Sequence, residues 1–188
     1  MNKLSLLVCC VAILIVMGCG ETTSNNGSKP GNDSKNDKAS GKTSKEYLDE
    51  GNTAFSSKDY RKAIEPYKKA YDLEKQDRKL EKKWWFILLD NLAIAYGITG
   101  DLTSSKEVME YGISKEPTYP LFYYNLADSY GEQNDEANAI KNLRLAYKYK
   151  DNVLEGEHVP DPATDTSFKF LMKNESFRKA VEDAKSGK

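Results

Sequence analysis

Three cysteines and one histidine are the residues of this chain best suited to thiol or metal chemistry. Cys9, Cys10 and Cys19 all lie within the first twenty residues, and the histidine is His158. Zinc sites use several Cys or His ligands at defined spacing, and a disulfide framework needs paired cysteines. The chain after residue 20 therefore has no thiol for nucleophilic catalysis, a disulfide or a Cys/His zinc site.

Acidic residues surround the histidine, which raises the question of a metal site. Glu155, Glu157, Asp161 and Asp165 flank His158 on a segment that contains proline. A single imidazole among carboxylates is a poor match to zinc sites, so we interpret the segment as a solvated acidic loop. The sequence also lacks a glycine-rich phosphate loop, a nucleophile elbow and a zincin motif. We therefore expect no enzyme activity, no cofactor and no metal.

The composition narrows the class of protein. A length of 188 residues is typical of one domain. Lys and Arg number 28, and Asp and Glu number 29, so no net basic charge favours nucleic acid as a partner. A mean hydropathy of −0.70 excludes a multi-span membrane protein.

Residues 1–18 have the pattern of a secretory signal. A short positive region precedes the apolar run Leu4 to Met17, which is shorter than the roughly 20 apolar residues that a spanning helix needs. The run leads into Val16-Met17-Gly18-Cys19, which resembles the lipobox of bacterial lipoproteins. That resemblance implies cleavage before Cys19 and lipidation of its sulfur. An ordinary signal peptide cut elsewhere is the alternative.

The lipoprotein resemblance also implies a location. Acyl chains on Cys19 would hold the mature chain at a membrane of the bacterial cell envelope. Gly20 follows the lipidated position, and in enteric bacteria a residue other than Asp there implies the outer membrane, facing the periplasm. Residues 19–43 are rich in Asn, Ser, Gly and Lys and predict a flexible tether. About 24 such residues span roughly 25–30 Å.

The remaining chain contains a helical repeat. Three segments that begin at Ser44, Phe86 and Pro120 align with one another, at spacings of 42 and 34 residues. Small residues are roughly a fifth to a quarter of ordinary composition, so their conservation of position across the segments is informative. They occupy the eighth, twentieth and twenty-seventh positions of every segment: Gly51, Ala63, Ala70, Ala93, Ser105, Gly112, Ala127, Ala139 and Ala146.

Turn residues support the same alignment. Asp59, Asp101 and Asp135 stand where the second helix of each pair should begin, and Asp is a preferred N-cap. Gly100 and Asn134 precede two of them and suit the left-handed backbone at a helix end. The segments therefore predict three helical hairpins.

These features resemble tetratricopeptide (TPR) repeats, which are antiparallel helix pairs with a period of 34 residues. The resemblance implies an all-α solenoid of three helix pairs over residues 44–85, 86–119 and 120–150. Residues 151–188 are a loop followed by a segment similar to the one that closes many bacterial TPR arrays. We expect its helices to cap the last repeat, because each repeat buries its apolar face only against its neighbours.

The first spacing exceeds the family period by eight residues. The inserted residues contain no helix breaker, so we expect Asp77 to cap a long helix that runs to about Thr99.

Two adjacent tryptophans lie in this region. Trp85 shares a helix face with apolar residues and is expected in the core, whereas Trp84 lies on a different face. Trp84, Lys82 and Lys83 form a candidate surface patch for anionic lipid or an acidic partner. A solvated helix face is the alternative.

TPR proteins usually bind peptide segments on a concave face formed by the first helix of each pair. Asn52 and Asn91 match the two Asn positions of the TPR clamp that binds the C-terminal carboxylate of chaperones, but Leu48, Leu121 and Asn125 replace its cations. The charge-assisted hydrogen bonds are then lost, so we reject that function. The resemblance places ten residues on the expected groove: Asn52, Phe55, Ile87, Asp90, Asn91, Ile94, Ile98, Leu121, Tyr124 and Asp128.

The expected groove is apolar and aromatic, with acidic residues at one end. Its ligand would be an extended or helical segment with apolar anchors and a basic residue. The leading hypothesis is a lipid-anchored interaction or assembly module whose partner is another envelope protein or peptide segment. One alternative is a self-associating structural component, a homo-oligomer, whose groove is filled by itself. The apolar groups could also pack within the array or receive the protein's own tail. A cell-wall-related enzyme is the third hypothesis.

Overall fold

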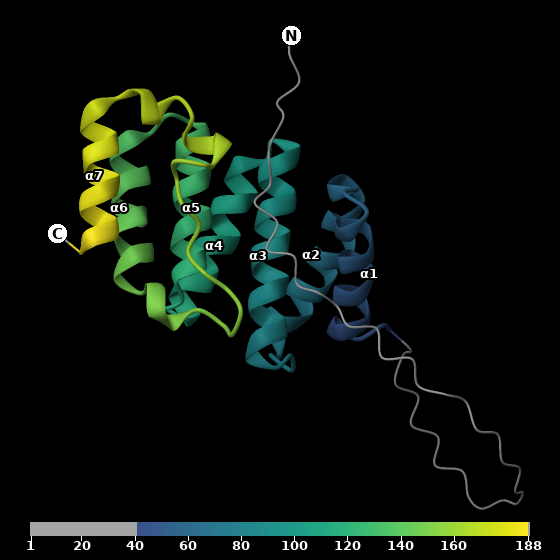
Figure 1. Ribbon diagram of the computed structural model, residues 1–188. Helices are drawn as coiled ribbons and strands as arrows, with labels where there is room; N and C mark the ends of the chain where they lie inside the picture. The colour runs from purple at the N-terminus through teal and green to yellow at the C-terminus, as the bar shows by residue number, and fades with distance from the viewer. Residues whose placement is uncertain (1–40, 188) are drawn as a thin grey trace, which may run out of the picture. The chain divides into compact units, whose positions relative to one another are not determined.

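A computed structural model of the protein describes residues 41–187 (Figure 1). Within this range every regular element is helical, and the predicted all-α class is confirmed. The predicted signal peptide, Cys19 and residues 20–40 of the tether lie outside the described residues. None of the described helices is long and apolar enough to cross a membrane. The helices are α1 (Ser44–Ser56), α2 (Tyr60–Gln76), α3 (Lys82–Thr99), α4 (Leu102–Lys115), α5 (Pro120–Glu132), α6 (Glu136–Lys148) and α7 (Glu175–Ser186).

Each helix packs against the next one in sequence, which produces a solenoid (Figure 1). Helices α1, α3 and α5 also contact one another in that order, and they form one layer of the array. Three 3₁₀ turns, η1 (Lys150–Asn152), η2 (Thr166–Phe168) and η3 (Leu171–Lys173), connect α6 to α7. Helix α7 covers α6 and closes the array, as predicted for the C-terminal cap.

The small residues of the repeat lie where helices approach most closely. All nine predicted positions are buried. At Gly112 of α4, for example, a Cβ atom would lie 2.8 Å from the ring of Phe122 on α5. Such contacts leave no room for a larger side chain, so the repeat's small residues determine how tightly the helices pack.

The predicted caps are confirmed at all three second helices. The carboxylates of Asp59, Asp101 and Asp135 each accept a hydrogen bond from the backbone N–H three residues later, at 3.1 or 3.2 Å. The preceding residues have left-handed backbones. Lys58 adopts φ 59°, although lysine, unlike glycine or asparagine, is disfavoured in that conformation.

The predicted start of the long helix at Asp77 is wrong. Helix α2 ends at Gln76 and α3 begins only at Lys82, so residues 77–81 form a loop. The buried carboxylate of Glu74 explains the break, because its Oε2 atom accepts hydrogen bonds from two backbone N–H groups of this loop, each at 3.0 Å. The Glu74 side chain thus accepts hydrogen bonds from backbone N–H groups that would otherwise need helical partners. The segment therefore need not continue the helix.

Candidate functional site

The ten predicted groove residues all lie on α1, α3 and α5, and we call the surface that they share the first-helix face. The structure divides them into two groups. Asn52, Phe55, Asn91, Ile94, Ile98 and Asp128 are partly exposed. Ile87, Asp90, Leu121 and Tyr124 are buried, with exposed fractions of 9% or less. Apart from Asp128 on α5, the partly exposed residues form an open part on α1 and α3, and the buried ones form a covered part on α3 and α5.

A hydrogen-bonded asparagine pair lies at the centre of the open part. The Tyr67 hydroxyl of α2 donates to Asn52 Oδ1 at 2.8 Å, and Asn91 Nδ2 lies 3.3 Å from the same oxygen and 3.1 Å from the hydroxyl. Among the described residues, the Asn52 amide nitrogen and the Asn91 carbonyl oxygen form no hydrogen bond. One donor and one acceptor are thereby held in place for an external peptide group.

Apolar side chains flank this asparagine pair. Phe55, Ile94 and Ile98 are partly exposed, and Phe55 packs against the hydrophobic core. Phe55 makes an edge contact with the Tyr67 ring at a centroid distance of 6.1 Å. A largely apolar surface with a few placed polar groups is typical of ligand-binding sites.

The chain's own tail covers the other part of the first-helix face. Residues 153–159, which we call the strap, follow η1 and pass across α5 (Figure 1). Leu154 and Val159 of the strap pack against the hydrophobic core. The possibility that the groove receives the protein's own tail is therefore realised on this half.

A tyrosine joins the strap to α3. The Tyr119 hydroxyl lies 2.8 Å from Glu157 Oε2 of the strap and 3.2 Å from Asp90 Oδ2 of α3. Asn125 Nδ2 donates to the other oxygen of Asp90 at 2.9 Å, and the Leu154 N–H donates to Glu157 Oε2 at 3.0 Å. Burial raises the pKa of Asp90 well above its usual range, and the nearby Glu157 carboxylate raises it further.

A second acid pair lies farther along α5. The Tyr124 hydroxyl donates to Asp165 Oδ2 at 2.9 Å. Asp128 Oδ1 is buried and has no hydrogen-bond partner among the described residues. Burial, and then the Asp165 charge, raise the pKa of Asp128 above its usual range. At both places an acidic residue of the first-helix face therefore meets an acidic residue of the tail.

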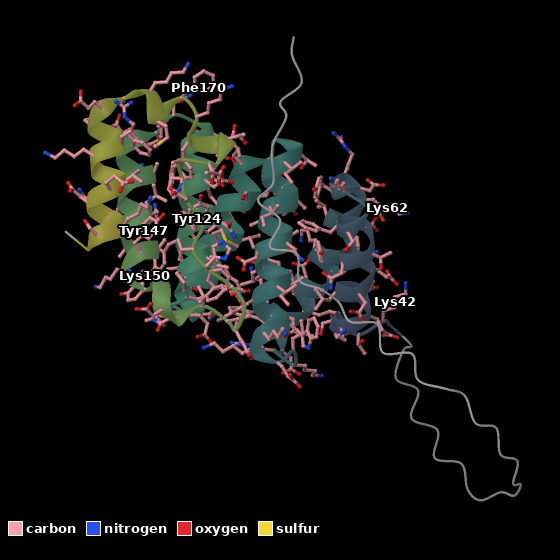
Figure 2. The ribbon with its side chains drawn as sticks, viewed as in Figure 1. Lys42, Lys62, Tyr124, Tyr147, Lys150 and Phe170 are labelled. Atoms are coloured by element: carbon pink, nitrogen blue, oxygen red, sulfur yellow. The ribbon has the colours of Figure 1, made fainter. Side chains whose placement is uncertain are left out.

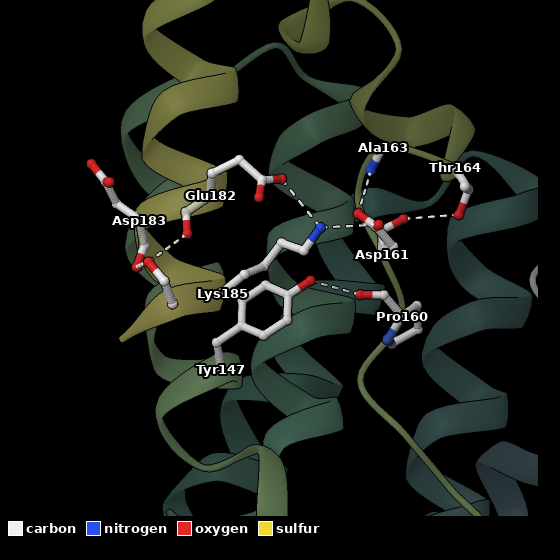
Figure 3. A network of polar contacts seen from close by, with 9 residues as sticks. Tyr147, Pro160, Asp161, Ala163, Thr164, Glu182, Asp183 and Lys185 are labelled. Carbon is white, nitrogen blue, oxygen red and sulfur yellow. Dashed lines mark hydrogen bonds and ion pairs between the residues drawn. The ribbon is translucent and has the colours of Figure 1, made fainter. Parts of the chain in front are cut away.

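A polar network, which we call the clamp, holds the chain just after the strap (Figure 3). The Tyr147 hydroxyl of α6 donates to the Pro160 carbonyl oxygen at 2.9 Å. Lys185 of α7 forms an ion pair with Asp161 at 3.0 Å and a second with Glu182 at 3.2 Å. The clamp therefore fastens the end of the strap to the C-terminal cap.

The predicted surface patch has a different environment. Trp84 is only partly exposed, with Lys45 Nζ 4.8 Å and Lys83 Nζ 5.7 Å from its ring centroid. Lys82 forms an ion pair with Glu116 at 3.0 Å. Trp85 is buried in the core, as predicted. Lys82 and Lys83 thus remain exposed, but Lys82 is paired with Glu116, and the Trp84 ring already has two lysine ammonium groups near it.

Side chains elsewhere differ in accessibility (Figure 2). Tyr124 and Tyr147 lie among the helices, whereas Phe170 is 62% exposed at the outer end of the tail.

His158 is exposed on the strap. Within residues 41–187, no group of three or more His, Cys, Asp or Glu residues is placed to hold a metal ion. Tyr119, which helps to organise the covered part, was not predicted, because nothing in its local sequence marks it; Asn125 was placed only at a position where the TPR clamp has a cation.

Comparison with known proteins bears on the fold. A family model described as the tetratricopeptide repeat matches residues 121–152. No curated protein matches the chain. The TPR domain of Sgt2 from Aspergillus fumigatus is a similar solved structure, with 22% identity, a TM-score of 0.51 and coverage of 77% of this chain and 82% of that one.

Two similar structures contain a segment of another protein. The Yersinia enterocolitica type III secretion chaperone SycD, solved with a peptide of the translocator YopD, is 16% identical, with a TM-score of 0.51 and coverage of 76% of this chain and 92% of that one. PcrH with the chaperone binding region of PopB is 10% identical, with a TM-score of 0.50 and coverage of 77% and 94%. The chain therefore contains a tetratricopeptide repeat and has the helical-solenoid fold of TPR proteins.

Proposed function

We propose that this protein is an interaction module that binds an extended segment of a partner protein on its first-helix face. The observation that carries the proposal is the strap, because a non-helical segment with apolar anchors already lies on half of that face. SycD and PcrH, which share the fold, were each solved with a segment of a partner. The fold therefore supports peptide recognition here.

The open part of the first-helix face is where we place the first contact with the partner. Its asparagine pair offers one donor and one acceptor to a peptide backbone, and Phe55, Ile94 and Ile98 offer apolar surface beside it. A partner segment would thus gain both backbone hydrogen bonds and side-chain burial there.

A photoreactive residue placed at Ile94 of the full chain in living cells tests this proposal. We expect a discrete crosslinked product that mass spectrometry maps to one segment of one partner protein. The same residue at Glu107, which is exposed on α4, is the control and should give no such product. A product at Trp84 without one at Ile94 would contradict the choice of face. A product with a second copy of this chain would favour self-association instead.

The location is a separate part of the proposal. We infer that acyl chains on Cys19 anchor the module in the bacterial cell envelope, with the outer membrane, facing the periplasm, as the expected site. The lipobox-like residues Val16 to Cys19 support this inference. Cells grown with labelled palmitate should label the wild-type chain and the control Cys10→Ala, but not Cys19→Ala. Labelling of the Cys19→Ala chain would refute lipidation at this residue.

A further inference from the structure

The strap brings the carboxylate of Glu157 close to the carboxylate of Asp90. Asp90 and Glu157 both lie within hydrogen-bond distance of the Tyr119 hydroxyl, which has one proton to donate. Only one carboxylate can accept that proton at a time, so the other must carry a proton itself or face the phenol oxygen without a hydrogen bond. Tyr119 is 2% exposed, so water compensates little for the mismatch. Glu157 is therefore an electrostatically poor occupant of this position.

The site beneath Glu157 has the features of a cation site. Asn125 orients the Asp90 carboxylate, and the Tyr119 ring beside it stacks on Phe86 at a centroid distance of 3.9 Å. Among the described residues, no Lys or Arg forms an ion pair with Asp90 or Glu157, and Arg78 and Lys82 pair with Glu116. A buried carboxylate among aromatic rings, without a positive partner, favours a cationic side chain.

Polar contacts fasten the chain on both sides of the strap. Asn152 Nδ2 donates to the Thr118 carbonyl oxygen at 3.2 Å before the strap, and the clamp holds Pro160 and Asp161 after it. Between these points the contacts to the first-helix face are the apolar side chains of Leu154 and Val159 and the hydrogen bond of Glu157. These polar contacts would keep the strap tethered at both ends if its centre left the face.

We propose that the site formed by Asp90, Tyr119 and Asn125 selects a Lys or Arg side chain of a partner segment, flanked by apolar residues, and that this segment displaces the strap. The inference rests on the proposed function and adds the chemistry of the ligand. The partner's apolar residues take the places of Leu154 and Val159, and its cation takes the place of Glu157. The strap then acts as a weak internal competitor for the same face.

A double-mutant cycle on the full chain in detergent micelles tests the charge preference of the site. Hydrogen exchange of the backbone amides of residues 153–159 reports how firmly the strap is bound. With Asp90 present, Glu157→Lys should slow this exchange at least about tenfold relative to Glu157→Gln. With Asp90→Asn, the two variants should exchange alike. Equal exchange in both backgrounds, or faster exchange for Glu157→Lys with Asp90 present, would overturn the proposal.

A peptide experiment tests displacement on the unmodified chain. The probe is a synthetic peptide of residues 152–160 with the change Glu157→Lys, and its control carries Glu157→Gln. The Lys probe should bind at least about tenfold more tightly than the control and should accelerate exchange of the strap. Equal affinities, or binding that leaves the strap protected, would refute the inference. Strap exchange that rises with protein concentration in the absence of peptide would assign the site to a second copy, and would also refute it.

Failure of this inference and failure of the proposed function give different results. A partner that crosslinks at Ile94 while the strap remains protected would leave the proposed function intact and overturn the cation site. Absence of any crosslink at Ile94, together with tight binding of the Lys probe, would overturn the proposed function and leave the cation site intact.

Discussion

Gly51 of α1 lies directly against the ring of Tyr67 of α2. A Cβ atom at residue 51 would be 2.3 Å from Cδ1 of that ring. The ring has no space to move aside, because Tyr67 is fully buried and its hydroxyl is bonded to Asn52 and lies 3.1 Å from Asn91 Nδ2. The absence of a side chain at residue 51 therefore lets Tyr67 organise the asparagine pair of the candidate site.

We expect Gly51→Ala to lower the free energy of unfolding by about 1–2 kcal/mol, because the cost of overpacking exceeds the gain in helix propensity. Urea unfolding followed by circular dichroism measures the change. Gly97→Ala is the matched control, since its Cβ would meet only Ser105 Oγ at 3.8 Å. The control should be neutral or slightly stabilising. Equal effects at the two glycines would contradict the close packing of α1 on α2.

The cap of α4 provides a second test. Asp101→Ala removes the carboxylate that accepts a hydrogen bond from the Ser104 N–H at 3.1 Å. The free energy of unfolding should fall by about 1 kcal/mol. Thr103→Ala, at an exposed position in the first turn of the same helix, should change it by less than about 0.5 kcal/mol. An Asp101→Ala protein as stable as the wild type would mean that this cap contributes nothing.

The buried carboxyl of Asp128 predicts a pH dependence of stability. The groups that face it are Asp165, Ser167, Glu132 and Tyr124, and no cation is among them. Its pKa lies above the ordinary value of 3.8, so the folded protein retains a proton that the unfolded chain releases. This carboxyl therefore lowers stability progressively as pH rises above about 4.

Asp128→Asn cannot ionise and should be more stable than the wild type at pH 7, by about 1 kcal/mol or more. The difference should vanish as the pH falls below the ordinary carboxyl range. Thermal unfolding at a series of pH values measures it. Asp135→Asn is a control of opposite sign, because the hydrogen bonds of that cap lower the pKa of Asp135. A pH-independent difference for Asp128→Asn would show that folding does not raise the pKa of this carboxyl.

The clamp predicts local rather than global effects. Tyr147→Phe removes the hydrogen bond to Pro160, and Lys185→Met removes the ion pair with Asp161. Each should accelerate hydrogen exchange of the Asp161, Ala163 and Thr164 amides and change the global free energy of unfolding by about 1 kcal/mol or less. Lys179→Met, at an exposed position of the same α7 helix, is the control and should leave that exchange unchanged. Unchanged exchange in both clamp variants would show that the clamp does not hold this segment.

Local sequence patterns were sufficient to predict the repeat architecture. The nine small residues and the caps Asp59, Asp101 and Asp135 recur because every helix pair has the same close packing and the same turn. Periodic chemistry of this kind appears directly in one sequence. Lipidation of Cys19 stays a prediction from its own short motif.

The prediction at Asp77 was wrong because a contact made by a single side chain overrides the local helix propensity. Asp77 follows good helix formers and was expected to cap a helix, but the Glu74 carboxylate binds the backbone of the following loop. Helix propensity is a weak effect that a single buried hydrogen-bonding side chain can override.

The sequence by itself determined the class of the fold, the helix pairs and which helices form the first-helix face. Only the tertiary structure decided how much of that face is open. Tyr119 and Glu157 are 38 residues apart, and neither lies in a periodic pattern. Their contact, and the buried pairing of Glu157 with Asp90 through one hydroxyl, depends on the route by which the tail returns over α5. That route follows from packing of Leu154 and Val159 and from the clamp, which no local pattern encodes.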